Sequence, residues 1–269
     1  QIPPMKTFLL AISLMAVHAF GQTSQTFFVQ PAYSTLSYRQ HIPALSFTAN
    51  QAAMARITKP VAGVYGEQRY GLHELGMYTA AAILPTRMGV FGGSVFYSGS
   101  PAYHTQGLGI AYARSLGKTH AGIQFHYAGQ RMAGYENNSR MGADIALQYE
   151  VSKEFIIGFQ VSQEGMFAMG KQSRSTPVYR MGGGYQVSDD CYIGVEMIRN
   201  NLQSAFLQSV MHYSFMDAFH AWAGYSSGNG SASGGAGYTK GKLRVDLNVS
   251  YHPFLGFTPG VGISKVMKP

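Results

Sequence analysis

The sequence predicts an all-β protein: a transmembrane, antiparallel, up-and-down β-barrel of about 14 strands, preceded by a short N-terminal segment. Apolar and polar residues alternate along most of the chain, and polar turns separate segments of strand length. Charged residues make up only 12% of the 269 residues, about half of the ~25% of an ordinary soluble domain. Abundant aromatic residues exclude a disordered chain, and a single cysteine excludes a disulfide scaffold. The net charge of +8 is too dispersed to form the basic stripe of a nucleic-acid binder.

Residues 1–21 are predicted to be a secretory signal peptide. Lys6 precedes a short apolar run over 8–17, and the small residues Ala19 and Gly21 favour cleavage before residue 22. The apolar run is too short for a spanning helix, and the alternative is a buried N-terminal strand or helix. Residues 1–4 are interpreted as lying upstream of the true start. An exported chain leaves its lone cysteine without an intramolecular partner, so that residue is expected to pack as a small hydrophobe.

The next part of the chain, 22–58, is predicted to be an N-terminal segment that contains the one short helix of the mature chain. This helix is expected over Gln51–Arg56, with Asn50 as its N-cap. The remainder, 59–269, is predicted to be the barrel.

Strands are predicted from a period of two in hydropathy, which places alternate residues on opposite faces. Between 139 and 151, for example, Met141, Ile145 and Tyr149 alternate with small and polar residues. Most segments are near the 9–11 residues of a membrane-spanning strand, although 202–213 and 231–239 are weakly patterned. The predicted strands are 60–68, 74–84, 88–97, 105–115, 119–130, 139–151, 154–164, 176–187, 191–200, 202–213, 218–226, 231–239, 242–252 and 258–267.

The two faces of these strands differ in chemistry, and the difference bears on the environment. One face carries Phe, Tyr, Ile, Val and Leu in strand after strand, and the other carries small and polar residues. A membrane barrel turns the apolar face outward, whereas a soluble barrel such as a lipocalin turns it inward. Periodicity alone does not decide between them. The export signal, the strand length, the tyrosines at strand ends and the scarcity of charge favour the bacterial outer membrane, with lipid and lipopolysaccharide as partners; a soluble secreted β-barrel binding module stays open as an alternative.

A sequence motif before the strands resembles a known family. Asn50-Gln51-Ala52-Ala53-Met54-Ala55 is similar to the Asn-Pro-Ala-Ala-Leu-Ala that opens outer-membrane barrels of the FadL and PorV/PorQ group, especially its small Bacteroidetes-type members. The chain departs from the pattern at Gln51, which replaces the proline, and at its C-terminal end, which lacks the usual aromatic residue. It is also shorter than most fatty-acid transporters of the group. The resemblance implies transport or delivery of a small hydrophobic molecule, or alternatively a type IX secretion-associated scaffold barrel with a plugged lumen and secretion-apparatus proteins as partners.

Motifs for catalysis, cofactors and metals are not found. His73-Glu74 has no second histidine at the spacing of a zinc protease helix, and the glycine-rich run before Leu243 has this leucine where a phosphate-binding loop needs Ser or Thr. The nine histidines show no metal-ligand spacing. We therefore predict a protein that is not an enzyme and has no catalytic residue, cofactor or metal site.

Ionisable residues on the polar face are the candidates for the functional site, because charges at bilayer depth must face inward and find partners or water. They form either a salt-bridge network that fills a narrow lumen or a ring that recognises a substrate. The sequence does not decide between these two interpretations, nor does it identify the molecule or partner. The lumen-facing candidates are Asp144, Glu150, Arg180, Glu196, Arg244, Asp246, His126 and His252.

Overall fold

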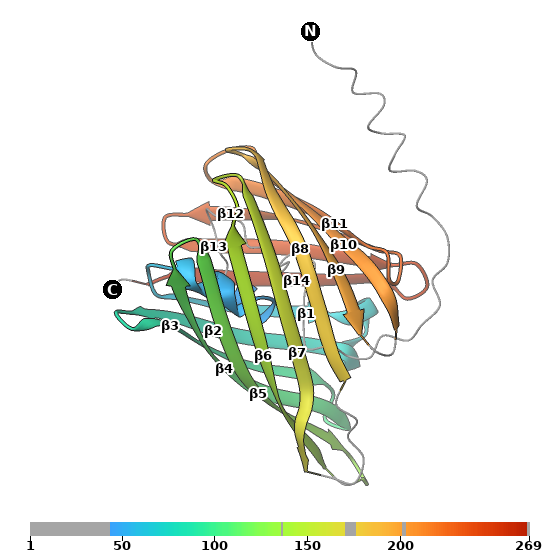
Figure 1. Ribbon diagram of the computed structural model, residues 1–269. Helices are drawn as coiled ribbons and strands as arrows, with labels where there is room; N and C mark the ends of the chain where they lie inside the picture. Colours follow the sequence, from blue (N-terminus) through green and yellow to red (C-terminus); the bar gives the residue numbers. More distant parts are fainter. Residues whose placement is uncertain (1–43, 136, 170–175, 201–202, 268–269) are drawn as a thin grey trace.

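The computed structural model is a closed antiparallel barrel in which every strand pairs with its neighbours in sequence (Figure 1). It describes residues 44–135, 137–169, 176–200 and 203–267, so the predicted signal peptide and most of the N-terminal segment lie outside the described residues. The strands are β1 (Val61–Gln68), β2 (Gly76–Thr86), β3 (Gly89–Gly99), β4 (Tyr103–Leu116), β5 (Thr119–Met132), β6 (Asn138–Glu150), β7 (Phe155–Met169), β8 (Thr176–Ser188), β9 (Cys191–Asn200), β10 (Gln203–Ser214), β11 (Phe219–Ser226), β12 (Ser231–Lys240), β13 (Leu243–His252) and β14 (Gly256–Val266).

Pairing of β1 with β14 closes the barrel. Val61 lies opposite Val266 and Glu67 lies opposite Gly260, with an unbroken register between them. The predicted fold class is confirmed, and each strand starts within two residues of its predicted start. The largest difference at a strand end is in β7, which continues to Met169 instead of stopping at 164.

The two rims of the barrel differ in the length of their connections. At one rim, hairpins of two to four residues join β2 to β3, β4 to β5, β6 to β7, β8 to β9, β10 to β11 and β12 to β13. Gly117 and Gly241 adopt positive φ in two of these tight turns, a conformation that glycine takes at no steric cost. The start of β1 and the end of β14 lie at this short-turn rim. At the opposite rim, the link between β1 and β2 contains two short 3-10 helices, η4 (Arg69–Gly71) and η5 (His73–Leu75).

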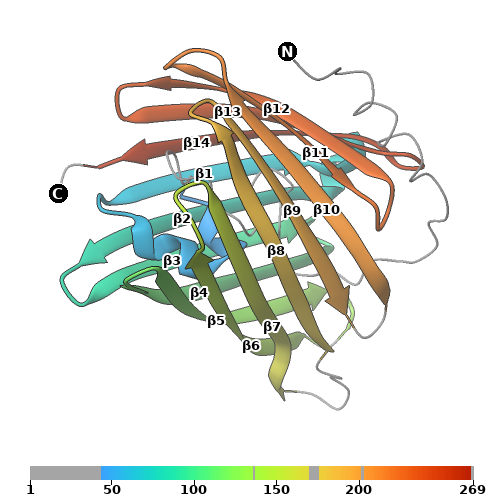
Figure 2. The same ribbon diagram turned by 45° about the horizontal axis from the view of Figure 1, so that its top comes forward.

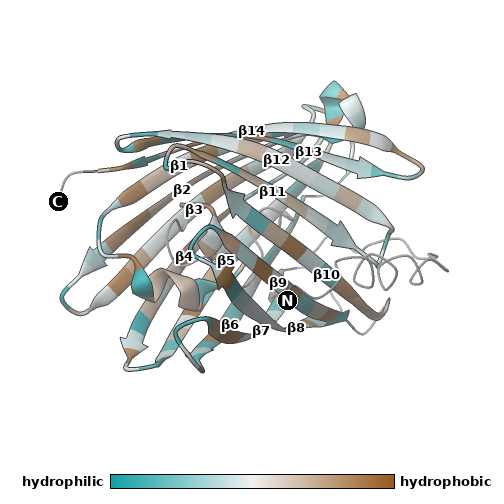
Figure 3. Ribbon diagram, turned by 90° about the horizontal axis from the view of Figure 1, so that it is seen from above, coloured by the Kyte–Doolittle hydropathy of each residue, from teal (hydrophilic) through white to brown (hydrophobic). Residues whose placement is uncertain are grey.

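The apolar face of the sheet is outside. Ile110, Phe125 and Leu247 expose about 60% of their surface, whereas inward-facing residues such as Glu196 are buried. Figure 3 shows the resulting alternation of hydrophobic and hydrophilic bands along the strands. This is the arrangement of a barrel whose outer wall meets lipid, and it is the reverse of a lipocalin-type soluble barrel.

Charged side chains on the outward face have a single sign and lie in particular places along the strands. In the described strands, the charged side chains at outward positions are all basic, and they stand near strand ends rather than in the middle. Long basic side chains near the ends of spanning elements reach the headgroup level. These residues are Arg114, Arg131, Arg199, Lys240 and Lys265.

The interior holds a segment of chain as well as side chains. Two 3-10 helices, η2 (Ser46–Thr48) and η3 (Gln51–Arg56), precede β1 and lie inside the barrel, mainly against β3 to β6 (Figures 1 and 2). We call residues 44–57 the plug. No helix among the described residues is long and apolar enough to cross a membrane.

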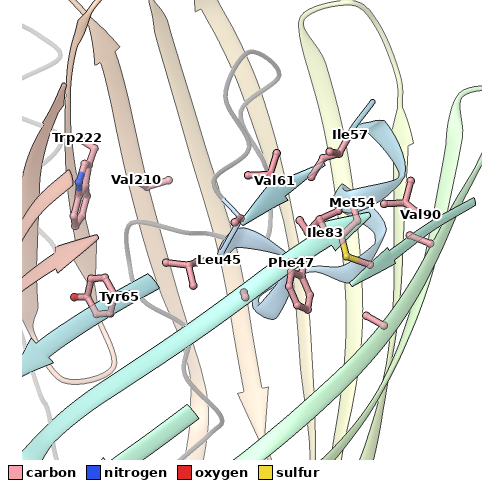
Figure 4. Packing of buried hydrophobic residues seen from close by; sticks show 14 of the residues in the cluster. Leu45, Phe47, Met54, Ile57, Val61, Tyr65, Ile83, Val90, Val210 and Trp222 are labelled. Atoms are coloured by element: carbon pink, nitrogen blue, oxygen red, sulfur yellow. The ribbon is translucent and has the colours of Figure 1, made fainter. Parts of the chain in front are cut away.

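The hydrophobic core lies between the plug and the barrel wall. Phe47 and Met54 of the plug are fully buried, and they pack with inward side chains such as Ile83 of β2 and Val90 of β3 (Figure 4). The cluster extends across the lumen to Trp222 of β11. The plug therefore supplies apolar contacts that the polar inner faces of the strands lack.

Candidate functional site

The plug is seated by close backbone contact with β5. Gly122 faces the plug, and a Cβ atom added there would lie 2.5 Å from the carbonyl carbon of Gln51 and 2.6 Å from the backbone nitrogen of Ala52. Only glycine permits such an approach. Within the plug, the Asn50 side chain accepts a hydrogen bond of 2.9 Å from the backbone N–H of Ala52, so the N-cap is the predicted residue although the helix is of the 3-10 type.

Gln51 anchors the plug to three strands. Its Nε2 donates to Oε1 of Gln124 on β5 at 2.7 Å and to Oδ2 of Asp144 on β6 at 3.4 Å. Its Oε1 accepts from Nε2 of Gln160 on β7 at 3.0 Å. All these side chains are buried. Gln51 stands where the similar motif has proline, and its side-chain amide pairs with the barrel wall.

A second polar group holds the end of the plug nearest the short-turn rim. Arg56 donates to Oε1 of Gln148 at 3.0 Å and lies 3.7 Å from the carboxylate of Glu150. The same carboxylate is 3.2 Å from Nε2 of His120, whose Nδ1 lies 2.8 Å from the Ser115 hydroxyl. The predicted candidate Glu150 therefore belongs to the attachment of the plug.

A cavity lies on the side of the plug away from the short-turn rim. It offers about 50 Å³ to the centres of water molecules, room for a few of them. Hydroxyl and amide side chains of β2 to β7 form much of its wall, and the apolar side chains of Phe96 on β3 and Val178 on β8, with β4 at positions 108 and 109, complete it. The polar lining residues are Thr48, Thr79, Ser94, Gln124, His126, Asp144, Gln160, Ser162 and Arg180; the apolar ones are Phe96, Leu108 and Val178.

The charged groups at the cavity are paired with neighbouring side chains. Asp144 accepts a short hydrogen bond of 2.5 Å from the Ser162 hydroxyl, and its other oxygen lies 3.5 Å from Nδ1 of His126. Arg180 is 95% buried, and its Nη2 is 3.6 Å from Oε1 of Glu196, which is also buried. The Nε atom of Arg180 has no hydrogen-bond partner. A buried cation therefore lies beside the cavity.

On the opposite side of the lumen, side chains of β11 and β13 form a separate network, and we call these strands with β12 the opposite wall. Both oxygens of Asp246 lie 2.9 Å from Nε of Arg244, and one is 2.7 Å from Nε2 of His220. The pairing of Arg244 with Asp246 agrees with their predicted position on one face. Trp222 donates to Oδ1 of Asn248 at 2.9 Å. These contacts join β11 to β13 across the strand between them.

Two glycines of β12 make this bridging possible. A Cβ at Gly237 would lie 2.0 Å from Nε2 of His220 and 2.3 Å from Oδ1 of Asp246. At Gly235 it would lie 2.3 Å from the indole nitrogen of Trp222. Side chains of β11 and β13 therefore meet over a strand that carries no inward side chain at 235 and 237. The same glycines account for the weak hydropathy pattern of this strand in the sequence.

The structure separates the predicted candidates into groups. Asp144, His126, Arg180 and Glu196 lie at or beside the cavity, and the Arg244–Asp246 pair belongs to the opposite wall. His252 stands apart at the rim opposite the short turns, where its Nδ1 accepts from the backbone N–H of Phe254 at 3.2 Å and its ring meets Tyr70 edge-on. Among the described residues, no three His, Cys, Asp or Glu side chains are placed to hold a metal ion.

Uncharged residues, which were not among the predicted candidates, complete these groups. Gln51, Gln124 and Gln160 hold the plug, and Trp222 and Asn248 close the opposite network. The strand residues in this set stand at inward positions, so the alternation that locates Asp144 locates them as well. The position of Gln51 inside the lumen has no such signal, because it lies outside the strands.

An apolar groove runs along the outside of β14 and β1 to β4. Its floor is made of small outward residues, among them Ala62, Ala80, Ala82 and Gly93, flanked by larger ones such as Ile110. A Cβ at Gly93 would meet no atom within 4 Å. The outer groove and the lumen cavity share lining residues on β3 and β4, so a single layer of sheet separates them; the shared residues are Ser94, Leu108 and Gly109.

Comparison with known proteins identifies the fold of this chain but not its activity. No protein-family model matches the chain, and no curated protein matches its sequence. The monoaromatic hydrocarbon channel CymD is similar in structure, with a TM-score of 0.64 and 10% identity over 85% of this chain and 94% of that one. The toluene transporter TodX of Pseudomonas putida has a TM-score of 0.58 and 9% identity over 87% and 94% of the two chains. Outer membrane protein Omp33 of Acinetobacter baumannii has a TM-score of 0.52 and 11% identity over 78% and 98%.

These similar structures are outer-membrane barrels, which is the class of fold that the sequence predicts. This chain has the fold of an outer-membrane β-barrel.

Proposed function

We propose that the protein is a non-catalytic outer-membrane barrel that passes a small, mainly apolar molecule from its lumen cavity through the wall into the outer groove. The observation that carries this proposal is the shared lining of the cavity and the groove at Ser94, Leu108 and Gly109. A molecule in the cavity is one sheet layer away from an apolar surface that faces lipid.

Residence in the outer membrane is supported by the outer surface. The exposed apolar belt would be costly in water, and basic residues near the strand ends match the anionic headgroups of outer-membrane lipid and lipopolysaccharide. A signal peptide over residues 1–21 would deliver the chain across the inner membrane. Running the protein on a detergent gel with and without boiling, after cell fractionation, tests this part: a soluble protein with no heat-dependent shift in mobility would contradict it.

The plug favours a sideways path over one straight through the lumen. It extends from Thr48 at the cavity to Arg56 beside Glu150, the last residue of β6, and so occupies the direct route along β4 to β6 toward the short-turn rim. An apolar molecule gains free energy by entering lipid rather than water. Structural similarity to a monoaromatic hydrocarbon channel and to a toluene transporter supports a small hydrophobic cargo.

Filling the outer groove tests the path. Gly93→Leu adds a lipid-facing side chain in open space, so the barrel should fold while uptake of radiolabelled toluene by whole cells falls several-fold. The matched control is Gly234→Leu, at an outward glycine of β12 whose added Cβ makes only ordinary contact, 3.4 Å from a backbone oxygen. Equal uptake by the two variants would reject the sideways path. Uptake by wild-type cells no faster than by cells without the protein would reject transport.

A second candidate is a type IX secretion-associated scaffold with a plugged lumen. The observation in its favour is the buried plug together with the hairpins of two to four residues at the short-turn rim. Its partners would be secretion-apparatus proteins. Their stable recovery with the barrel from detergent extracts, combined with liposomes that stay impermeable to toluene and other small solutes, would favour this role over transport.

A further inference from the structure

We infer that the outer groove binds one anionic phospholipid, with an acyl chain along its floor and the headgroup phosphate at a cluster of three lysines where β14 ends. This inference goes beyond the proposed function, because it concerns the outer surface and requires neither the lumen cavity nor a transported cargo. The two share only residence in the outer membrane. The evidence is the course of the groove, the lysines at its mouth and the charge of the rim on which they lie.

The floor of the groove runs obliquely from the short-turn rim toward the middle of the wall. Outward residues lie directly opposite one another across neighbouring strands in a single row: Lys265, Ala62, Ala82, Gly93 and Ile110. Lys265 stands one residue before the end of β14, whereas Ile110 stands six residues before the end of β4. Four strand spacings of about 4.8 Å give this row a length of about 19 Å. The row therefore begins at headgroup level and descends to the depth of the acyl chains.

Larger side chains border the row on both sides. Toward the rim, Leu84 and Phe91 lie opposite each other on β2 and β3. Away from the rim, Val64 and Val95 lie on either side of Ala80. The four larger side chains are all exposed, so they rise beside a low floor. An acyl chain in the groove gains contact on its floor and both sides, and such close packing stabilises association within a bilayer, where all surroundings are apolar.

Three lysines surround the mouth of the groove. Backbone N–H groups at the end of β14 donate to the carbonyl of Lys242, at 2.9 Å, and to that of Pro60, at 2.7 Å. Lys242 and Lys59 therefore lie on either side of the strand end that carries Lys265. All three lysines are exposed, and none takes part in an ion pair of the described residues. A lipid phosphate would supply the counter-charge that the protein does not.

The short-turn rim is basic where it borders the groove. From β12 through β14 to β5, the exposed charged side chains that the structure describes at this rim are all basic: Lys59, Arg87, Arg114, Lys118, Lys240, Lys242 and Lys265. Over the rest of the described rim, four exposed acidic residues accompany one exposed lysine: Glu154, Asp189, Asp190, Asp217 and Lys153. Short turns of outer-membrane barrels lie on the periplasmic side, whose leaflet is phospholipid and not lipopolysaccharide. The lysines would repel the ammonium of phosphatidylethanolamine, so the site favours phosphatidylglycerol.

The experiment is native mass spectrometry of the purified full chain in detergent, with phosphatidylglycerol, phosphatidylethanolamine and lipid A offered together at equal concentration. We expect one bound phosphatidylglycerol per barrel, preferred about fivefold or more over either other lipid. Lys265→Gln should lower phosphatidylglycerol binding about fivefold, the usual contribution of one basic residue beside an anionic lipid. The matched control is Lys153→Gln, at an exposed lysine of the same rim outside the groove, which should leave binding unchanged.

A floor variant tests the position of the acyl chain. Ala82→Leu should weaken binding of both phospholipids several-fold, whereas Ala236→Leu, at an outward alanine of β12, should not; both variants should keep the heat-dependent gel shift. Equal binding of the two phospholipids, or equal phosphatidylglycerol binding in wild type, Lys265→Gln and Ala82→Leu, would overturn the inference.

Two other outcomes would also overturn it. Tighter binding of lipid A would assign the groove to lipopolysaccharide, and a dimer of barrels that Ala82→Leu dissociates would assign it to a second copy of the chain. The proposed function is tested separately: toluene uptake without a preference for phosphatidylglycerol would reject only this inference, whereas that preference without uptake would reject only transport.

Discussion

The two halves of the barrel interior are filled by different means. Between β3 and β7, a separate segment of chain enters the lumen and is held by backbone contact at Gly122 and by the amide of Gln51. Between β11 and β13, side chains of the wall fill the lumen themselves, because His220 and Asp246 meet over Gly237 of β12. The first half can be emptied in principle by moving one segment. The second can be changed only by altering the wall.

This difference indicates that the plug is the part that can move and that the opposite wall is rigid. The cavity lies beside the plug, with Thr48 in its lining, and so shares a boundary with the part that is not a strand. The opposite network ties β11 to β13 across β12 through charge-assisted hydrogen bonds, which are stronger than neutral ones. We therefore expect substitutions at the plug to change permeation and substitutions at the opposite wall to change stability alone.

The largest effect is expected for Gly122→Leu. The added side chain would collide with the backbone of the plug at Gln51, and backbone cannot move aside as a side-chain tip can. Overpacking costs about 1–3 kcal/mol, and here we expect a loss near the upper end, about 3 kcal/mol, in urea unfolding followed by the heat-dependent gel shift. Ion conductance in planar bilayers should rise because the plug is displaced. The control is Ala121→Leu, an outward neighbour on the same strand; unchanged conductance in Gly122→Leu would contradict a seated plug.

A smaller effect is expected for Gly237→Val on the opposite wall. Its side chain would separate His220 from Asp246, at a cost of about 2 kcal/mol within the usual range for overpacking. Conductance should stay at the wild-type level because the plug is untouched. Gly234→Val serves as the control on the outward face of the same strand. A rise in conductance as large as that of Gly122→Leu would erase the distinction between the two halves.

The smallest effect is expected for Asn50→Ala, which removes the cap of η3 but adds no bulk. Loss of a helix N-cap costs about 1 kcal/mol, measurable as a lower urea midpoint, with at most a slight gain in conductance. Asn50→Ser retains a capping oxygen and should recover most of the loss. Equal midpoints for Asn50→Ala and wild type would show that the bond to Ala52 contributes nothing to the seating of the plug.

The strands could be predicted from the sequence because each carries its own signal. In β9, apolar outward residues such as Ile193 and Val195 alternate with inward Gly194 and Glu196, and the turn at 189–190 marks the start. β12 has a weak hydropathy pattern, because its inward glycines leave room for side chains of β11 and β13. The need for glycine at these positions is visible only once β11 and β13 are placed beside β12.

The site could be predicted in part. A period of two places Asp144, Arg180 and Glu196 on the inner face, but it does not give their partners, which depend on the register between strands. A period of two does not predict the position of the plug, because the plug is not a strand. Its helix and cap could be read from Asn50 onward, whereas its position inside the barrel depends on long-range contacts such as Gln51 with Gln160.

The short link between the plug and β1 has a consequence for the order of folding. Only four residues, 57–60, separate η3 from β1, and β1 completes the barrel by pairing with β14, about two hundred positions away in the chain. Contacts this distant in sequence form late and slowly. Until that seam forms there is no enclosed lumen for the plug to occupy. The pairing of β14 with β1 therefore determines when the plug becomes shielded from water.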